Sequence, residues 1–151
     1  MADLDIDMTR TLEELERSNW GEPTFDSYLV TTCHALRRKP LADFGTEDLR
    51  IMIGQNIGVS FLLPLAVRVL QADPLASGDC YHGDLLVAVL ACDLKKSPDW
   101  PKFVLSLEDI ADRALKLLAR EHGGIDGEIL SNLRSGAQRL REIQKVSCLE
   151  S

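Results

Sequence analysis

The chain has 151 residues, a length that suits a single domain and can bury a sizeable core without disulfides or metals. Hydrophobic residues make up 45% and charged residues 27%, a globular balance that argues against disorder. Seventeen Lys and Arg against 24 Asp and Glu give a net charge of −7, the opposite of the basic footprint of proteins that bind nucleic acid or anionic lipid. We therefore expect neither nucleic acid nor a membrane as partner.

The negative charge is unevenly distributed along the chain. Residues through Leu130 carry −9, whereas those from Ser131 onward carry +2. An acidic body attracts basic partners and speeds their encounter. Solubility alone is the plainer explanation of the same charge.

The cysteines and the apolar runs bear on the cellular compartment. The chain contains four cysteines, which are Cys33, Cys80, Cys92 and Cys148. Its first residues lack the basic start and apolar core of a signal peptide, so we expect no export and reduced thiols. The longest apolar run, residues 59–67, is far shorter than the ~20 residues of a membrane span. These features predict a cytoplasmic protein.

The first predicted helix begins after Thr11, whose side chain can cap the helix together with Glu14 three residues later. Gly21 and Pro23 end this segment. Trp20, next to them, is expected to anchor the segment on the core. The acidic residues 1–10 lack periodicity and are expected to be a flexible N-terminus.

The second helix is predicted over residues 24–38 and ends before Pro40. Its apolar side chains, which recur every three or four residues, are Phe25, Tyr28, Leu29, Thr32 and Leu36. We expect this face in the core, and we expect Arg37, Arg38 and Lys39 to be a solvated helix end that complements the helix dipole.

The third helix is predicted to begin with Thr46 as its cap and with Glu47 and Asp48 in its first turn. Gly54 is unfavourable inside a helix, and we attribute the presence of a glycine there to close helix packing. Gly58 is expected to stop the helix.

The rest of the chain is also predicted to be helical. A central buried helix over residues 60–72 is followed by a loop over 73–83, a short apolar helix over 84–92, a short helix over 100–105, an amphipathic helix from Ser106 to Gly123 and Gly124, and a last helix over 127–146. In the last two, Leu117 and Ile143 are among the side chains expected to face inward. No strand alternation is present. The prediction is an all-α orthogonal bundle of about six to eight helices, with residues 11–151 as one domain.

Thiols and imidazoles lie close together at Cys33-His34 and at Cys80 and His82. A zinc site needs four such ligands, and adjacent residues of a helix point about 100° apart, so we expect no metal and no cofactor. A small enzyme that uses Cys33 or Cys80 with a histidine is an alternative, although nothing marks an activated thiol. Paired carboxylates at helix starts are explained by the helix dipole. We therefore expect no catalytic residues.

Blocks between Thr11 and Leu90 resemble contact-dependent growth inhibition (CDI) immunity proteins. They are residues 12–16 (LEELE), 20–23 (WGEP), 25–34 (FDSYLVTTCH), 36–41 (LRRKPL), 47–58 (EDLRIMIGQNIG), 64–66 (PLA), 73–75 (DPL), 78–79 (GD), 81 (Y) and 83–86 (GDLL). The resemblance implies a cytoplasmic, non-enzymatic partner that binds the C-terminal toxin domain of a large surface exoprotein and blocks its active site. Such toxins are frequently nucleases, and we expect RNA, for instance a tRNA, as the substrate. The alternative is a helical adaptor or regulator.

Two groups of side chains are candidates for toxin binding, because both lie at loops or helix starts where side chains are expected to project freely. The first group is Glu22, Asp26, Asp43, Glu47 and Asp48, and the second, which we favour, is Asp79, Tyr81, His82 and Asp84. Tyr81 adds an aromatic anchor of the kind that dominates interface energetics. Helix capping and solubility are the competing explanation of the acidic residues.

Overall fold

The computed structural model describes residues 6–24, 26–120 and 127–149, with side chains as far as Lys145. These residues form seven α-helices and two short 3-10 helices, and they contain no strand. The elements are α1 (Leu12–Glu16), α2 (Tyr28–Arg37), η1 (Leu41–Asp43), α3 (Thr46–Gly54), α4 (Val59–Ala72), α5 (Asp84–Ala91), η2 (Leu94–Lys96), α6 (Trp100–Arg120) and α7 (Gly127–Leu149). The predicted all-α fold with six to eight helices is confirmed.

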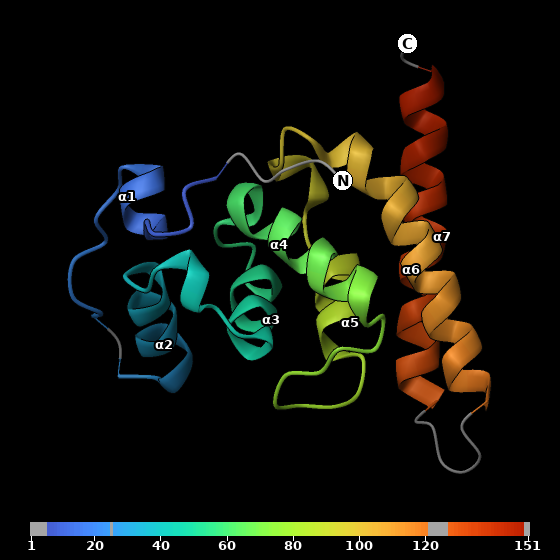
Figure 1. Cartoon of the computed structure of the whole chain (residues 1–151), viewed down its shortest axis with the longest axis horizontal. Coiled ribbons are helices and arrows are strands. Elements are labelled where there is room, and N and C mark those ends of the chain that lie inside the picture. The colour runs from blue at the N-terminus through green and yellow to red at the C-terminus, as the bar shows by residue number, and fades with distance from the viewer. Residues whose placement is uncertain (1–5, 25, 121–126, 150–151) are drawn as a thin grey trace.

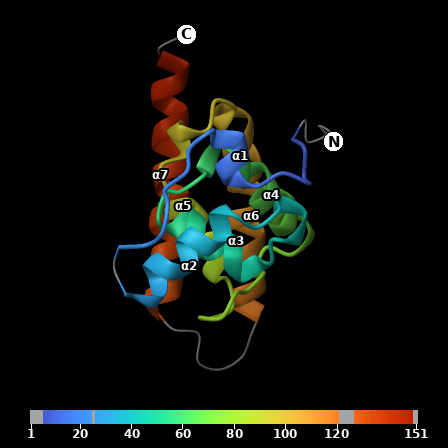
Figure 2. The same ribbon diagram turned by 90° about the vertical axis from the view of Figure 1, so that its left-hand side faces the viewer.

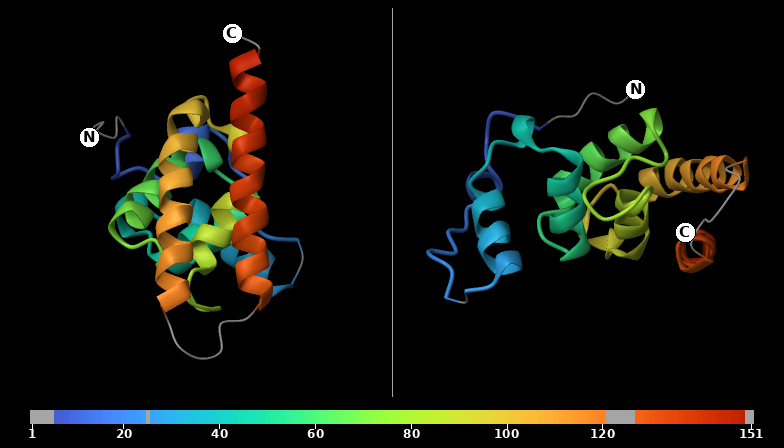
Figure 3. Two further views of the ribbon diagram at one scale, coloured as in Figure 1. Left: turned by 90° about the vertical axis from the view of Figure 1, so that its right-hand side faces the viewer. Right: turned by 90° about the horizontal axis from the view of Figure 1, so that it is seen from below.

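The helices form three groups along the long axis of the molecule (Figure 1). The centre consists of α3, α4 and α5, and α4 is the buried central helix that its apolar sequence predicts. α1 and α2 lie at one end of this centre, nearest the viewer in Figure 2. At the other end α6 and α7 form an antiparallel pair, with α6 against α4 and α7 against α5 (Figure 3).

The N-terminal segment is partly held against the body. The predicted capping box of Thr11 and Glu14 is present, and Leu12 of α1 is fully buried. Residues 1–5 of the expected flexible segment lie outside the described residues. Within residues 6–10, Met8 packs against the core, and the Leu41 N–H donates to the Arg10 carbonyl at 3.0 Å. This part of the segment is therefore ordered by η1.

Helix α2 begins four residues later than the sequence predicts. Ser27 is the cap, and its hydroxyl accepts from the Val30 N–H at 3.1 Å. The later start leaves Tyr28 80% exposed and Leu29 41% exposed, so their prediction as core residues is wrong. The inward face of α2 is instead formed by Cys33, Leu36 and Arg37, and Phe25 lies outside the described residues.

Three predictions about helix α3 are also wrong. Its cap is Gly45, and the Asp48 carboxylate accepts from the Gly45 N–H at 3.0 Å, so Thr46 is the first helical residue. Gly54 makes no close packing, because a Cβ there would meet nothing within 4 Å. Gly58 does not stop α3, which ends at Gly54 with Gln55 as its cap, and in a left-handed conformation with φ of +64° it caps the start of α4 instead.

The predicted break at Ser106 does not occur, and α6 runs unbroken from Trp100 to Arg120. The buried stripe is continuous across the predicted junction, from Val104 through Leu107 to Ile110, so packing against α4 holds one long helix. Leu117, expected to face inward, is 39% exposed. Gly123 and Gly124, the predicted stop, lie outside the described residues.

Candidate functional site

The loop of residues 73–83 is organised by the first residue of α5. Asp84 is only 2% exposed, and its carboxylate accepts three backbone N–H groups of the loop. Oδ1 accepts from Gly78 at 2.6 Å, while Oδ2 accepts from Cys80 at 3.0 Å and from Tyr81 at 3.3 Å. A carboxylate that receives several N–H groups forms strong, charge-assisted bonds and fixes the backbone around it.

Helix α3 supplies a second attachment for the same loop. Glu47 Oε2 accepts from the Asp79 N–H at 2.7 Å. Arg50, one turn further along α3, binds Glu47 and lies 3.7 Å from Asp84 Oδ2. The hydrogen bond to Glu47 raises the pKa of the Arg50 guanidinium above its ordinary value, so this cation stays charged between the two carboxylates.

Four consecutive exposed residues of the loop are Asp79, Cys80, Tyr81 and His82. The ring of Tyr81 is half-covered, with 37% of the residue exposed. Partial burial raises the pKa of the Tyr81 phenol, and the negative charge of the Asp84 carboxylate raises it further. The phenol therefore stays neutral and keeps its O–H donor at ordinary pH. The loop thus combines an acidic, an aromatic and an imidazole side chain on one short stretch.

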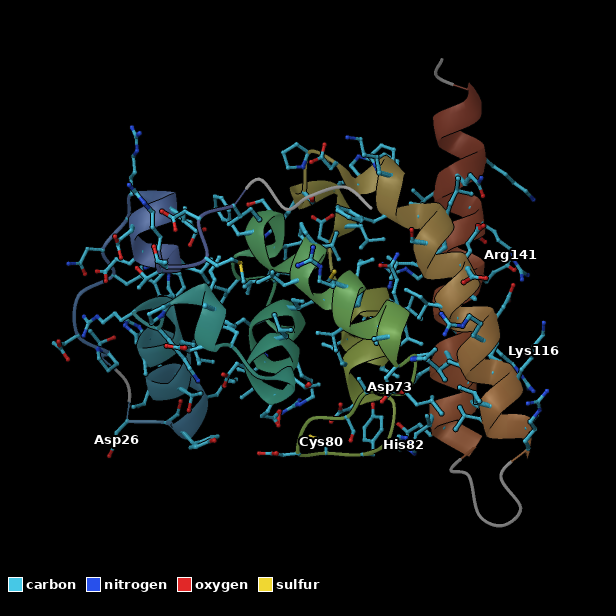
Figure 4. The ribbon with its side chains drawn as sticks, viewed as in Figure 1. Asp26, Asp73, Cys80, His82, Lys116 and Arg141 are labelled. Carbon is cyan, nitrogen blue, oxygen red and sulfur yellow. The ribbon has the colours of Figure 1, made fainter. Side chains whose placement is uncertain are left out.

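The two predicted groups of acidic residues are rearranged by the fold. Glu47, assigned to the first group, lies beside Asp79 of the second. Figure 4 shows Cys80 and His82 together at the loop, with Asp26 far to one side, beyond α2. The starts of the second and third predicted helices therefore do not form a single acidic surface.

The other members of the first group are distributed between ion pairs and solvent. Glu22 lies 3.3 Å from Arg38, and Asp48 lies 2.7 Å from Lys39. Asp43 is exposed at the end of η1. Glu22 and Asp48 thus have partners within the chain.

The expectation that all of these side chains project freely is wrong for Asp84. The side chain is buried beneath the loop because its oxygens face three amides that have no other acceptor in the loop. Glu47 is also mostly covered, with 19% of its side chain exposed. These two carboxylates shape the loop, whereas Asp79, Tyr81 and His82 form its outer surface.

In the basic run at the end of α2, Arg37 is not the solvated side chain that the sequence predicts. Arg37 is 2% exposed and donates to the Ser18 carbonyl at 2.9 Å and to Glu16 at 3.0 Å. Its guanidinium carbon lies 4.2 Å from the centre of the Trp20 ring. Trp20 is 46% exposed, so this residue anchors the segment by covering Arg37 and not by entering the core.

Two of the thiols described by the structure, those of Cys33 and Cys92, do not suit a nucleophile. Cys33 and Cys92 are buried, and burial raises the pKa of Cys33 and raises that of Cys92 to about 12. His34 binds the Gly21 carbonyl and packs edge-on against Trp20, so it does not serve Cys33. Among the described residues no three His, Cys, Asp or Glu side chains are grouped as metal ligands.

Sequence reasoning missed a shallow groove of about 280 Å³ between α5 and α7. Its walls come from Val87, Leu90, Ala91, Asn132, Ser135, Gly136 and Arg139. No local sequence pattern predicts this groove, because the two helices that form it lie far apart in the chain. It is separate from the outer surface of the loop.

No helix among the described residues is long and apolar enough to cross a membrane.

Comparison with known protein families supports the resemblance seen in the sequence. No curated protein matches the chain. The family model of CDI immunity proteins matches residues 14–107, well over half of the chain, and this segment includes α3, the loop and α5. The chain therefore belongs to the CDI immunity proteins, which bind and neutralise a cognate CDI toxin.

Proposed function

We propose that this immunity protein neutralises a nuclease toxin domain, the C-terminal region of a large surface exoprotein, by covering its active site. RNA, and tRNA in particular, is the substrate class that we assign to the toxin. The immunity protein itself needs no catalytic residue for this role, because occupation of the toxin's cleft is enough to exclude the nucleic acid.

The observation that carries the proposal is the acidic, aromatic surface formed by α3 and the loop of residues 73–83. A nuclease holds a polyanion, so its active cleft is basic. Asp79, whose backbone N–H is held by Glu47, is exposed on a protein of net charge −7 and suits such a cleft. Tyr81 adds a half-exposed ring to the same loop. We call the outer surface of Asp79, Tyr81 and His82 the loop surface.

The role is tested by producing the chain together with the toxin domain encoded beside it. We expect the two proteins to purify as a complex, and we expect the toxin's cleavage of tRNA to stop when the immunity protein is added in equal amount. Failure of the chain to protect cells from that toxin domain would contradict the immunity role. A complex with a toxin that cleaves no nucleic acid would contradict the nuclease assignment alone.

The loop surface is tested by a pair of matched double variants. Asp79→Ala/Tyr81→Ala removes one acid and one tyrosine from the loop, and we expect toxin affinity to fall about 30-fold, equivalent to ~2 kcal/mol. Asp26→Ala/Tyr28→Ala removes the same two residue types from the start of α2, where both are exposed, and should leave affinity within about twofold. The opposite ranking, measured by calorimetry, would move the interface to α2.

A further inference from the structure

The loop surface stands on carboxylates that lie beneath it. Asp84 is almost completely buried, and it receives the N–H groups of Gly78, Cys80 and Tyr81 at 2.6, 3.0 and 3.3 Å. A buried carboxylate is tolerated only where hydrogen bonds and a nearby cation replace its water. Arg50, 3.7 Å away, supplies the cation. The bonds to Asp84 are therefore a stable feature of the folded chain.

Glu47 holds the loop from the side of α3. Its Oε2 accepts from the Asp79 N–H at 2.7 Å, and Arg50 binds its other oxygen. Gly78 passes so close that a Cβ there would lie 3.0 Å from the Cα of Glu47. The loop backbone is thus bonded to two elements, α3 and α5, and packed against one of them.

The tethered amides belong to the residues that face the solvent. The backbone N–H of Asp79 donates to Glu47 and that of Tyr81 donates to Asp84, while both residues are exposed. Fixing the backbone of a residue costs about 1–2 kcal/mol of conformational entropy. In this loop the backbone becomes ordered when the chain folds, so little of this entropy cost remains to oppose toxin binding.

We propose that Asp84 and Glu47 are positioning residues for toxin recognition, which hold Asp79 and Tyr81 in the geometry that the toxin binds without themselves needing to touch it. The proposal rests on the proposed function, because it takes the loop surface to be the docking site. It assigns to Asp84 a role in binding that its burial would otherwise conceal.

The isosteric variant Asp84→Asn tests the proposal through a double-mutant cycle. A single amide oxygen cannot replace two carboxylate oxygens that serve three amides, so we expect toxin affinity to fall at least 10-fold. In the Asp79→Ala/Tyr81→Ala background the same change should cost less than twofold, because the side chains that Asp84 positions are already gone. Asp109→Asn on α6 makes the same change of charge at an exposed site and should be neutral. Unchanged affinity, or a full additive loss, would overturn the proposal.

Glu47 provides a second variant pair that separates positioning from direct charge contact. Glu47→Ala removes the acceptor of the Asp79 N–H and should weaken binding about 3- to 10-fold. Glu47→Gln keeps an oxygen acceptor at the same reach and should restore affinity to within twofold of wild type. A Glu47→Gln variant as weak as Glu47→Ala would assign the carboxylate a direct contact with the toxin and contradict its positioning role.

Hydrogen exchange of the free protein tests the loop without any toxin. The amides of Gly78, Asp79, Cys80 and Tyr81 should exchange slowly in the wild type. In Asp84→Asn those of Gly78, Cys80 and Tyr81 should exchange at least 10-fold faster, while the amides of α4 keep their rates and report an intact fold. Fast exchange in the wild type overturns the positioning role and leaves the immunity function standing. Slow exchange together with unchanged affinity of Asp79→Ala/Tyr81→Ala overturns the loop surface, and the positioning role with it.

Discussion

At the scale of single residues, Arg37 shows how one buried cation joins segments that the sequence leaves separate. Its two terminal nitrogens bind the Ser18 carbonyl and the Glu16 carboxylate, and its flat guanidinium lies against the ring of Trp20. A planar group with several donors suits this combination of bonds and stacking. Arg37 thereby holds the segment after α1 on α2.

The first prediction follows from this geometry. Arg37→Lys should lower the free energy of unfolding by ~1–3 kcal/mol, because an ammonium cannot serve both acceptors while stacking on Trp20. Urea denaturation followed by tryptophan fluorescence measures the loss. Arg113→Lys on α6, an exposed residue, is the control and should stay within about 0.5 kcal/mol. Equal stability of the two variants would show that the buried contacts of Arg37 do not contribute.

A second prediction concerns the buried thiol of Cys92. Burial raises its pKa from 9.0 to about 12, so above pH 9 the unfolded chain loses a proton that the folded chain keeps. The Cys92 contribution to stability is therefore constant below pH 9 and falls by about 1.4 kcal/mol per pH unit above it, up to pH 12. Urea denaturation at pH 8, 9 and 10 should show a steeper decline for the wild type than for Cys92→Ala. Parallel declines would contradict burial of a protonated thiol.

At the scale of the elements, the position of α7 depends on one glycine. A Cβ at Gly136 would lie 2.6 Å from Leu90 Cβ, so α7 and α5 approach too closely there for any larger residue. Arg139, one turn further along, donates to the Leu90 carbonyl at 3.3 Å. Close packing at Gly136 thus sets the groove between the two helices.

The third prediction compares two glycines in helices. Gly136→Ala should lower the free energy of unfolding by ~1–3 kcal/mol, because α7 must shift away from Leu90. Gly54→Ala, where nothing lies within 4 Å, should instead raise it by ~0.5–1 kcal/mol through helix propensity. Thermal and urea denaturation of both variants measure the two signs. A stabilising Gly136→Ala would mean that α7 adjusts without cost.

At the scale of the whole molecule, α3, α5 and α7 begin at the same end of the bundle, beside the loop (Figure 1). Each has an acid in its first turn, namely Glu47, Asp84 and Glu128, and the partial positive charge of a helix start stabilises such acids. Helix dipoles therefore explain why carboxylates gather at this end. Because Asp84 is buried and Glu47 is mostly covered, the exposed Asp79 is the acid of the loop surface that would face a basic partner.

The fourth prediction concerns the rate of association with the toxin. Raising the salt from about 50 to about 500 mM shortens the Debye length from roughly 14 Å to about 4 Å, so long-range attraction by a chain of charge −7 weakens. The association rate should fall steeply with salt, whereas the dissociation rate should change little, because close packing determines it. Stopped-flow mixing measures both. An association rate independent of salt would contradict electrostatic steering by the acidic chain, while the immunity role would still stand.

Much of this protein was determined by local sequence. Helix number, the capping box at Thr11, the central position of α4 and the loop of residues 73–83 follow from hydrophobic periodicity, capping residues and glycine or proline, which act over a few neighbours. The family was recognisable for the same reason, since its blocks are contiguous in the chain.

Only the tertiary structure decided which side chains those helices bury and bring together. Asp84 and Asp79 look alike as acids in a polar loop, yet one is buried because three amides converge on it and the other is exposed. Glu47 reaches Asp79 across 32 positions of chain, and no periodicity encodes that meeting. The candidate site could therefore be predicted as a loop but not as a surface, because hydrogen bonds and packing between distant segments determine which of its residues face the solvent.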